Sequence, residues 1–475
     1  MINHITPPKR PNGRFRPGQG LQAAAALAAM AVLLPLLAAC SVLEAAIAPL
    51  PTAAVSAAGE VQFVLAGTPL AAVMTPGGYI PAALGSPLDP TATPTPTTTP
   101  TPTATLPSDL GPPLAPPTVV AAVPPINFAA ARANAQAVGL DIAYTKIGFH
   151  TGPGGNAQGI GDYFRKLDAA GVPIFLKSAD AAGPVYEVQQ LMAANDAAGR
   201  DVPHILVFRL TDGRYEAPFY NRQLSPEEAA AVSWQLNRDS IPRELDKKYV
   251  WFETLNEPGR YGDDGKLQIE RLGRFSLATA KLAVAEGYRY AALSFSTGVP
   301  EPEDWEEPSM LEFLRYAGEH RDQVAIALHE YSLINGDIAA GYPYLVGRFQ
   351  ALFDVCDRYG IPRPTILITE WGWEYDGVPE PELAMEHIAW ASWLYAAYPE
   401  VKGAAIWYLG PQFGGIANKA QRLIAPLGDY AVSHYFVYDP GIGRIDATLF
   451  YPPWRSATES ILTAPTPFPR PRQMP

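Results

Sequence analysis

Two glutamates lie where apolar, strand-like stretches of the sequence end. Glu257 belongs to WFETLNEP (251–258), which starts apolar and breaks at a Pro-Gly turn, and Glu370 belongs to TILITEWG (365–372). Two carboxyl groups held near each other can cleave a glycosidic bond, one as nucleophile and the other as acid and then base. Alternatively, each glutamate could simply cap a loop or pair with an arginine.

Eight stretches of the chain have the apolar, β-branched character of strands, and helical patterns lie between many of them. The expected strands are 143–149, 173–177, 204–209, 249–255, 288–295, 324–329, 365–369 and 401–408, and the expected helices are 226–237, 269–286, 311–320, 345–359 and 381–398. Crossover helices impose parallel strands. The pattern therefore predicts an α/β fold, a (β/α)8 TIM barrel over residues 126–462.

An open, doubly wound sheet is the alternative fold. Such a sheet usually carries a phosphate-binding glycine turn after its first strand. The glycines of TGPGGNAQGIG (151–161) match neither dinucleotide-binding nor P-loop spacing. We interpret them as a loop over the mouth of the barrel.

In a TIM barrel the carboxyl ends of all strands share one face, so the residues that end the strands form one site. Polar and aromatic residues at these ends are His150, Lys177, Arg209, Asn256, His329, Tyr331, Trp371 and Trp407. Sugars are bound by this mixture, because hydroxyls need polar partners and ring faces pack on aromatic planes. His329 and Tyr331 are two residues apart, so both could orient Glu370. Trp407 could form the floor of the site or only pack in the barrel, and Glu253 is interpreted as structural.

These residues resemble those of the clan-A retaining glycoside hydrolases, most closely the cellulase and mannanase family, glycoside hydrolase family 5. The family's Asn-Glu-Pro segment matches 256–258, its nucleophile segment matches 370–372, its His-any-Tyr matches His329 and Tyr331, and its eighth-strand tryptophan matches Trp407. The resemblance covers the barrel alone. It implies that Glu257 is the acid/base and Glu370 the nucleophile, and it implies no metal and no organic cofactor.

The sequence departs from this family in its early strands. The family's arginine and histidine there have no clear counterparts, although Lys177 and Arg209 could neutralise the nucleophile instead. A non-catalytic, carbohydrate-binding barrel on a surface lipoprotein is therefore a second hypothesis. If the chain is an enzyme, we expect apolar surroundings and the charge on Glu370 to raise the pKa of Glu257.

Composition limits the partners and the redox chemistry. The 475 residues include 35 Lys and Arg against 47 Asp and Glu, a formal net charge of −12. This balance argues against nucleic acid and against electrostatic adhesion to an anionic membrane, while a neutral polysaccharide remains compatible. Cys40 and Cys356 are the only cysteines, so no disulfide framework is expected, and Cys356 has the spacing of a buried helical thiol. We expect a monomer.

Residues 1–40 have the layout of a lipoprotein signal peptide. A basic segment, 1–20, precedes an uncharged run rich in Ala and Leu, 21–39. The run ends in LAAC (37–40), which resembles the lipobox of bacterial lipoproteins, in which cleavage leaves a lipid-modified cysteine. An uncleaved membrane anchor is the alternative. Both readings export the chain and leave it at the cell surface, in contact with the membrane only through this anchor.

Two further segments lack the apolar periodicity of a folded domain. Residues 41–125 are rich in Ala, Pro and Thr and include TATPTPTTTPTPT (91–103), and residues 463–475 form a Pro-rich tail. Such composition predicts a disordered, extended linker. Because this segment offers little apolar surface to offset the entropy of ordering it, we expect residues before about 125 to be dispensable for folding.

The lipobox-like motif predicts that Cys40 is lipidated and becomes the mature amino terminus. Replacing the residue, Cys40→Ser, removes the thiol to which the lipid would be attached. The variant should no longer incorporate labelled fatty acid, and it should leave the detergent phase in a phase-separation assay. Fatty-acid labelling that persists in Cys40→Ser would contradict the assignment.

Overall fold

A computed structural model describes most of the predicted barrel domain. The described residues are 114–259, 268–333, 337–374, 377–411, 413–441, 443 and 445–450, with five short strands between 52 and 79. The chain divides into two units, 1–99 and 100–475. The signal segment with Cys40, the Pro/Thr-rich run 91–103 and the tail 463–475 lie outside the described residues. Within the described part, no helix is both long and apolar enough to cross a membrane.

The first unit contains short antiparallel strands. Three of them, β1 (Thr52–Val55), β2 (Val61–Leu65) and β3 (Thr68–Ala71), form one sheet, and β4 (Met74–Thr75) pairs with β5 (Gly78–Tyr79). All other helices and strands that the structure describes belong to the second unit.

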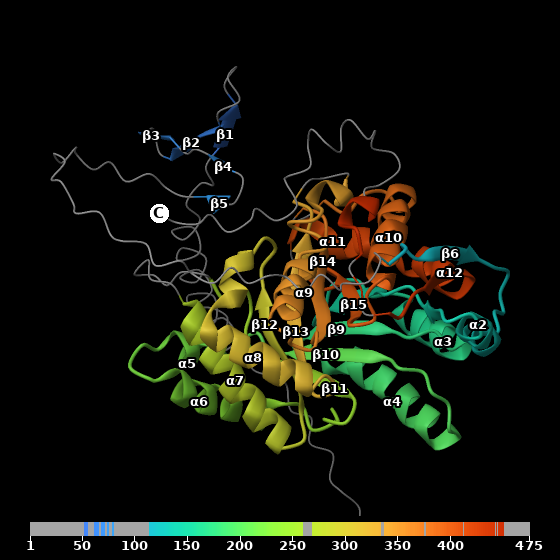
Figure 1. The fold of residues 1–475 in the computed structure, drawn as a ribbon, viewed down its shortest axis with the longest axis horizontal. Helices are drawn as coiled ribbons and strands as arrows, with labels where there is room; N and C mark the ends of the chain where they lie inside the picture. Colours follow the sequence, from blue (N-terminus) through green and yellow to red (C-terminus); the bar gives the residue numbers. More distant parts are fainter. Residues whose placement is uncertain are drawn as a thin grey trace, which may run out of the picture. The chain divides into compact units, whose positions relative to one another are not determined.

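Eight parallel strands of the second unit close into a barrel (Figure 1). They are β8 (Ile147–Thr151), β9 (Phe175–Ala179), β10 (Ile205–Arg209), β11 (Val250–Glu253), β12 (Arg289–Phe295), β13 (Val324–Tyr331), β14 (Thr365–Gly372) and β15 (Val401–Ile406). Closure occurs where β15 pairs with β8, at Ala404 with Ile147. The predicted TIM barrel is confirmed, and every expected strand overlaps a barrel strand.

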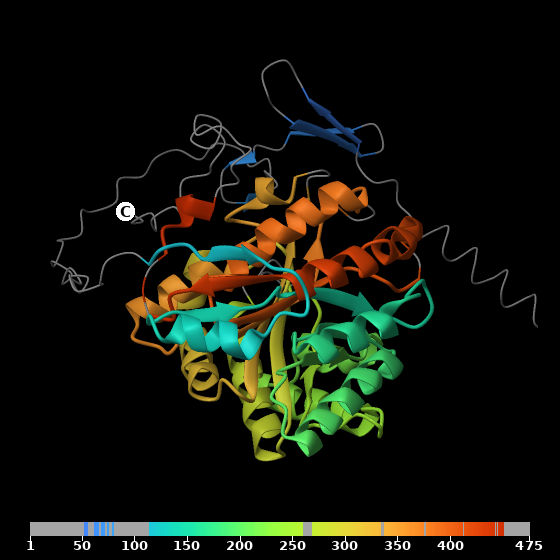
Figure 2. The same cartoon turned by 90° about the vertical axis from the view of Figure 1, so that its right-hand side faces the viewer.

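Helices cover the outside of the barrel (Figure 2). The longer ones are α3 (Ile160–Ala170), α4 (Ala182–Ala198), α6 (Pro226–Ser240), α7 (Ile269–Ala285), α8 (Pro308–Glu319), α9 (Phe349–Arg358), α10 (Pro381–Ala396) and α12 (Ile424–Ser433). The shorter ones are α2 (Phe128–Gln136), α5 (Ala217–Tyr220) and α11 (Ile416–Gln421), with 3-10 turns at Gly213–Tyr215, Pro302–Glu306, Ile338–Gly341, Phe413–Gly415 and Ala447–Phe450. The five predicted helices correspond to α6 through α10.

Local sequence explains where these helices start. Ser225 caps α6 in a capping box with Glu228, and Pro226 occupies the first helical position, where its missing N–H costs nothing. Glu330, buried on β13, accepts hydrogen bonds from the backbone N–H groups of Gly347 and Arg348, just before α9 begins. The buried carboxylate thereby fixes the amino-terminal end of α9 against the barrel.

The barrel interior is closed by a layer of apolar side chains below the carboxyl ends of the strands. This layer consists of Phe175, Val207, Trp251, Ala291, Ala325, Ala327, Leu367 and Ala405. Two bulky rings fit because their neighbours are small: a Cβ at Gly403 would lie 2.3 Å from Cδ2 of Phe175. The polar residues of the next layer therefore rest on a packed floor.

A small antiparallel sheet flanks the barrel and was not expected from the sequence. Its strands, in spatial order, are β6 (Thr118–Ala121), β16 (His434–Tyr438) and β7 (Asp141–Ala143). The predicted strand 143–149 spans the end of β7 and the start of β8. Because β6 precedes residue 126, the folded unit extends further toward the amino terminus than the sequence boundary placed it, at least to Leu114, which bridges to Ile445.

The position of β6 changes the truncation expected to be harmless. A chain that begins at Pro125 lacks the β6–β16 ladder and the carbonyl of Pro117, which accepts a 2.6 Å hydrogen bond from Nε1 of Trp393. We expect it to melt below a chain that begins at Asp109, by about 2–4 °C for each kcal/mol lost. Thermal unfolding of both chains measures this. Equal melting temperatures would show that β6 contributes nothing to stability.

Candidate active site

The turn after β11 holds Glu257 in an unusual backbone conformation. Its φ is 45°, in the left-handed region that residues other than glycine seldom adopt. The backbone N–H of Glu257 donates a 2.9 Å hydrogen bond to the carbonyl of Ser294, which the register identifies as an extra residue on β12 opposite β13. The bulge on β12 thus compensates for a strained turn that costs about 1–3 kcal/mol.

A second bulge positions Glu370. Leu328 of β13 pairs with Ile368 of β14, but the next residue, His329, pairs with Glu370, so Thr369 is an extra residue on β14. A bulge turns the following side chains to the opposite face of the strand. It brings Glu370 beside His329 and Tyr331, which project from β13 on the same side.

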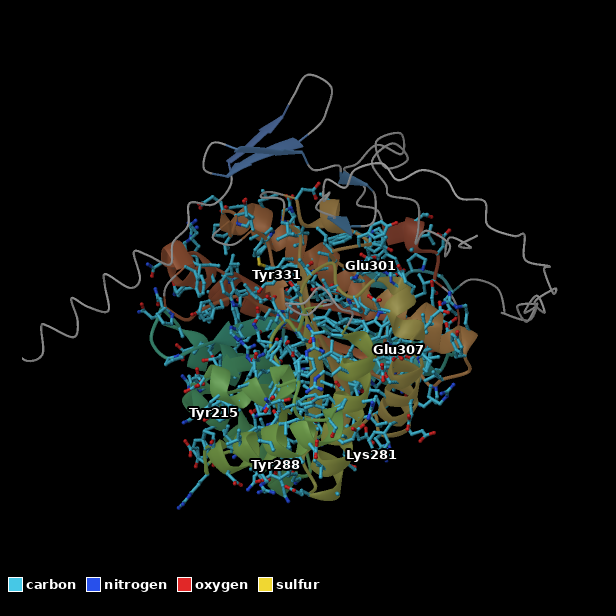
Figure 3. The ribbon with its side chains drawn as sticks, turned by 90° about the vertical axis from the view of Figure 1, so that its left-hand side faces the viewer. Tyr215, Lys281, Tyr288, Glu301, Glu307 and Tyr331 are labelled. Atoms are coloured by element: carbon cyan, nitrogen blue, oxygen red, sulfur yellow. The ribbon has the colours of Figure 1, made fainter. Side chains whose placement is uncertain are left out.

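The two glutamates share His329 between them. Nδ1 of His329 lies 2.9 Å from Oε1 of Glu257 and 3.5 Å from Oε2 of Glu370. One oxygen of each carboxylate and one ring nitrogen of His329 all lie within 4.8 Å of one another. The hydroxyl of Tyr331, labelled in Figure 3, donates a 2.7 Å hydrogen bond to Oε2 of Glu370. The structure therefore brings together the four residues on which the sequence analysis placed most weight.

A buried ion-pair network lies under the glutamates. Nζ of Lys177 is 2.7 Å from both carboxylate oxygens of Glu253, and neither side chain is exposed. Arg209 connects this pair to the site above it: its Nε lies 3.6 Å from Oε1 of Glu253, and its Nη2 lies 3.8 Å from Oε1 of Glu370. Burial alone would raise the pKa of Glu253, but Lys177 and Arg209 outweigh it and hold the pKa below its ordinary value. Glu253 is thus held in a buried ion-pair network with Lys177 and Arg209, which agrees with its interpretation as structural.

The expected elevation of the Glu257 pKa is wrong for this arrangement. Burial is the largest single influence and raises it. Hydrogen bonds from His329 and from Ser296, together with the charges of His329 and Arg209, outweigh burial and lower the pKa below its ordinary value. The sequence analysis counted the negative charge of Glu370, but it could not know that His329 lies between the two carboxylates.

Two predicted binding residues, His150 and Asn256, line the same face of the barrel. His150 is 2% exposed, and its ring centroid lies 5.2 Å from that of Tyr408. Burial, with the charges of Lys177 and Arg209, lowers the pKa of His150 well below its ordinary value, so the ring is neutral. Both of its nitrogens, and Oδ1 of Asn256, are buried without a hydrogen-bond partner among the described residues.

The two predicted tryptophans have different environments. Trp407 is partly exposed, with its ring 6.2 Å from that of Tyr331 and stacked on Tyr408 at 4.8 Å. Trp371 is fully buried on the opposite face of β14, where it packs on Trp373 at 5.2 Å. Trp371 is therefore part of the core between barrel and helices, and the structure does not place it with the other candidate residues.

Sequence reasoning missed one acidic group, Glu216. It lies in the loop after β10, at the start of α5, and accepts a hydrogen bond from the backbone N–H of Asn256. Burial raises the pKa of Glu216, Arg209 lowers it and Glu253 raises it further, and the net shift is upward. No strand end or motif marks this position, so only the length of the loop after β10 could have drawn attention to it.

The chain was compared with protein families, curated proteins and solved structures. No protein-family model and no curated protein matches the chain. Its structure is similar to a "GH5-4 broad specificity endoglucanase from Clostridium acetobutylicum", with 13% sequence identity and a TM-score of 0.35, over 56% of this chain and 87% of that one. A likeness this distant carries no argument about this chain's family or reaction.

The Lys177–Glu253 pair gives a sharp stability prediction. Replacing the lysine, Lys177→Met, leaves Glu253 buried without its nearest positive charge, so the free energy of unfolding should fall by about 3–5 kcal/mol. Chemical denaturation measures this. The matched control is Lys166→Met, because Lys166 forms an exposed pair with Asp429 and should cost less than about 1 kcal/mol.

Two further observations test the cause of that loss. Adding Glu253→Leu to Lys177→Met removes the uncompensated charge and should recover part of the stability. Because the pKa of Glu253 is depressed in the folded state, its contribution is present above the unfolded carboxyl pKa and is lost as pH falls through the folded value. Equal losses in Lys177→Met and in the control would refute the buried-pair explanation.

Proposed function

We propose that this protein is an exported, retaining β-glycoside hydrolase that cleaves a polysaccharide or oligosaccharide by double displacement. The observation that carries the proposal is the separation of the two carboxylates, whose facing oxygens lie within 4.8 Å. Retaining enzymes hold their carboxyl groups about 5–5.5 Å apart, whereas inverting enzymes need about 6.5–9.5 Å to admit a water molecule. The short distance leaves room for direct attack by one carboxylate on the sugar.

Glu370 has the environment of the nucleophile. Its side chain is 9% exposed, and the hydroxyl of Tyr331 and the guanidinium of Arg209 both face its oxygens. These contacts hold the carboxylate in place, and the carboxylate attacks the anomeric carbon as the bond to the leaving oxygen breaks. The product of this step is a glycosyl ester of Glu370.

Glu257 has the position of the acid and base. Its side chain is 38% exposed, so it reaches the mouth of the site where a leaving group departs. It gives a proton to the leaving oxygen in the first step and takes one from water in the second. A leaving group that takes over the hydrogen bond of His329 removes the contact that lowers the pKa of Glu257, and thereby favours the protonated form.

The surrounding residues supply a carbohydrate-binding surface. A neutral imidazole at His150 offers one donor and one acceptor, and the side-chain oxygen of Asn256 offers an acceptor. The ring of Trp407 provides an apolar plane for the face of a sugar. We propose that these groups, with Arg209, His329 and Tyr331, bind hydroxyls next to the bond that is cleaved.

A metal-dependent mechanism is an alternative to this proposal. Glu257, His329 and Glu370 could together hold a metal ion by the spacing of their ligand atoms. Against this, Nη2 of Arg209 lies 3.8 Å from Glu370 and would repel a cation, and Tyr331 already donates to the same carboxylate. Proton chemistry with no metal and no organic cofactor therefore fits better, and hydrolysis should be insensitive to a chelator.

Export and anchoring complete the proposal. They rest on the sequence of residues 1–40 alone, with Cys40 as the lipidated residue and the cell surface as the location. A monomer that contacts the membrane only through this anchor, and that binds no nucleic acid, agrees with the acidic composition. The competing hypothesis is a surface lipoprotein whose barrel binds carbohydrate without cleaving it.

Kinetics with aryl β-glycosides separate the roles of the two glutamates. Glu370→Gln should abolish turnover on every substrate, because no glycosyl ester can form. Glu257→Ala should lose about 10²–10⁴-fold on poor leaving groups, yet it should still form the ester from activated aryl glycosides and then stall. Azide needs no base, so it should restart turnover in Glu257→Ala and give the β-glycosyl azide.

The control for these variants is Glu382→Gln, because Glu382 is exposed on α10 and should leave turnover unchanged. Formation of the β-glycosyl azide by Glu370→Ala, with the inverted azide from Glu257→Ala, would mean that the roles are reversed. Carbohydrate binding by the wild-type protein without hydrolysis of any aryl β-glycoside would favour the non-catalytic alternative instead.

A further inference from the structure

The amino-terminal mouth of the barrel contains a pocket of about 320 Å³. Residues at or just before the starts of six strands line it, from β10 to β15, among them Trp251 of β11, Arg289 of β12, Arg321 before β13, Thr365 of β14 and Lys402 of β15. Because all barrel strands are parallel, this mouth lies at the opposite end of the barrel from Glu257 and Glu370. Figure 3 shows the two ends: Tyr331 is the last residue of β13 at one end, and Tyr288 lies just before β12 at the other.

The pocket carries an excess of positive charge in a chain that is acidic overall. Five basic and three acidic side chains line it: Arg200, Lys248, Arg289, Arg321 and Lys402, against Asp196, Asp201 and Asp322. Two of the basic groups are already paired, Lys248 with Asp196 and Arg200 with Asp168. The excess positive charge of the pocket therefore depends on the other three basic residues, Arg289, Arg321 and Lys402.

Arg289, Arg321 and Lys402 have no salt-bridge partner within 4 Å in the part of the chain that the structure describes. Arg321 and Lys402 donate to the backbone carbonyls of Gly318 and Pro399. Asp322 faces both Arg289 and Lys402, and Glu400 acts more strongly than Asp322 on Lys402. Two carboxylates near three cations leave one positive charge uncompensated, although Arg289 is half-buried, where charges are normally paired.

Trp251 adds an independent observation. Its side chain lines the pocket and is only 4% exposed, yet its indole N–H has no acceptor among the described residues. A buried N–H left without a partner costs about 1–3 kcal/mol. The guanidinium of Arg289 lies 5.8 Å from the centre of the same ring. Two kinds of donor, one neutral and one charged, therefore line one small cavity that holds too few acceptors for them.

We propose that this pocket binds the phosphate group of a small molecule, either free phosphate or a phosphate monoester. The donors need a ligand with several acceptor oxygens and a negative charge, and phosphate matches the fork of an arginine with two parallel hydrogen bonds. Lys402 supplies a second charge, and Trp251 donates to a third oxygen. The volume is at the lower end of small-molecule sites, which suits a phosphate with a short organic group.

Calorimetric titration of the full chain tests the proposal, with inorganic phosphate in one arm and glycerol phosphate in the other, and with chloride at matched ionic strength as the blank. Saturable binding of at least one of them with a dissociation constant of about 1 mM or lower is expected. Arg289→Met and Lys402→Gln should each weaken it at least tenfold. Tighter binding of glycerol phosphate assigns the site to a monoester, and equal or tighter binding of inorganic phosphate assigns it to the free ion.

The control is Arg315→Met, which removes a positive charge from the exposed face of α8 and should leave the titration unchanged. If Arg289→Met unfolds, Lys402→Gln decides the question, because Lys402 is exposed. Absence of saturable binding of both ligands, or binding unchanged in Lys402→Gln, overturns the proposal. None of these outcomes depends on the proposed hydrolysis, which takes place at the other end of the barrel.

Discussion

Two carboxylates within 4.8 Å of each other repel, and the rest of the site can be understood as the means of holding them there. At an effective dielectric constant of 20, the repulsion is about 3 kcal/mol. His329 lies between the two groups, Tyr331 donates to one of them, and Arg209 approaches the same one from below. All three depend on a closed parallel barrel, because only there do β10, β13 and β14 present their carboxyl ends to one point.

The ion-pair network below Glu257 and Glu370 explains how the barrel interior holds Arg209 and Lys177 side by side. Two cations in a water-poor interior would repel, but Glu253 faces both, at 2.7 Å from Lys177 and 3.6 Å from Arg209. Arg209 consequently has an anion below it and an anion above it, and the network continues without a break from the barrel floor to Glu370. The resembled family has an arginine and a histidine on its early strands that have no clear counterparts here. In this chain Arg209, which is held by Glu253 of the Lys177–Glu253 pair, places positive charge beside Glu370 instead.

The sequence predicts the barrel well because buried parallel strands are continuous apolar runs that end abruptly in polar residues. It fails where strands are short and pair across the chain: β6 and β16 are more than 300 residues apart, and neither has a periodic pattern. It also fails at Trp371. Simple alternation from Leu367 would turn Trp371 inward and Glu370 outward, but the extra residue Thr369 reverses both. Neither a bulge nor a pocket at the strand starts leaves a motif in the sequence.

The lowered pKa of Glu257 has the same electrostatic origin, and it affects when this residue gives up and takes up a proton in the proposed reaction. Glu257 shares the site with three other carboxyl groups, those of Glu216, Glu253 and Glu370, and with the basic groups of Lys177 and Arg209. In the proposed mechanism Glu370 becomes an ester and loses its negative charge, and the pKa of Glu257 then falls further, since the nearest like charge is gone. A carboxyl group that gives up its proton as the ester forms is then a base when water arrives, so one electrostatic coupling serves both halves of the reaction.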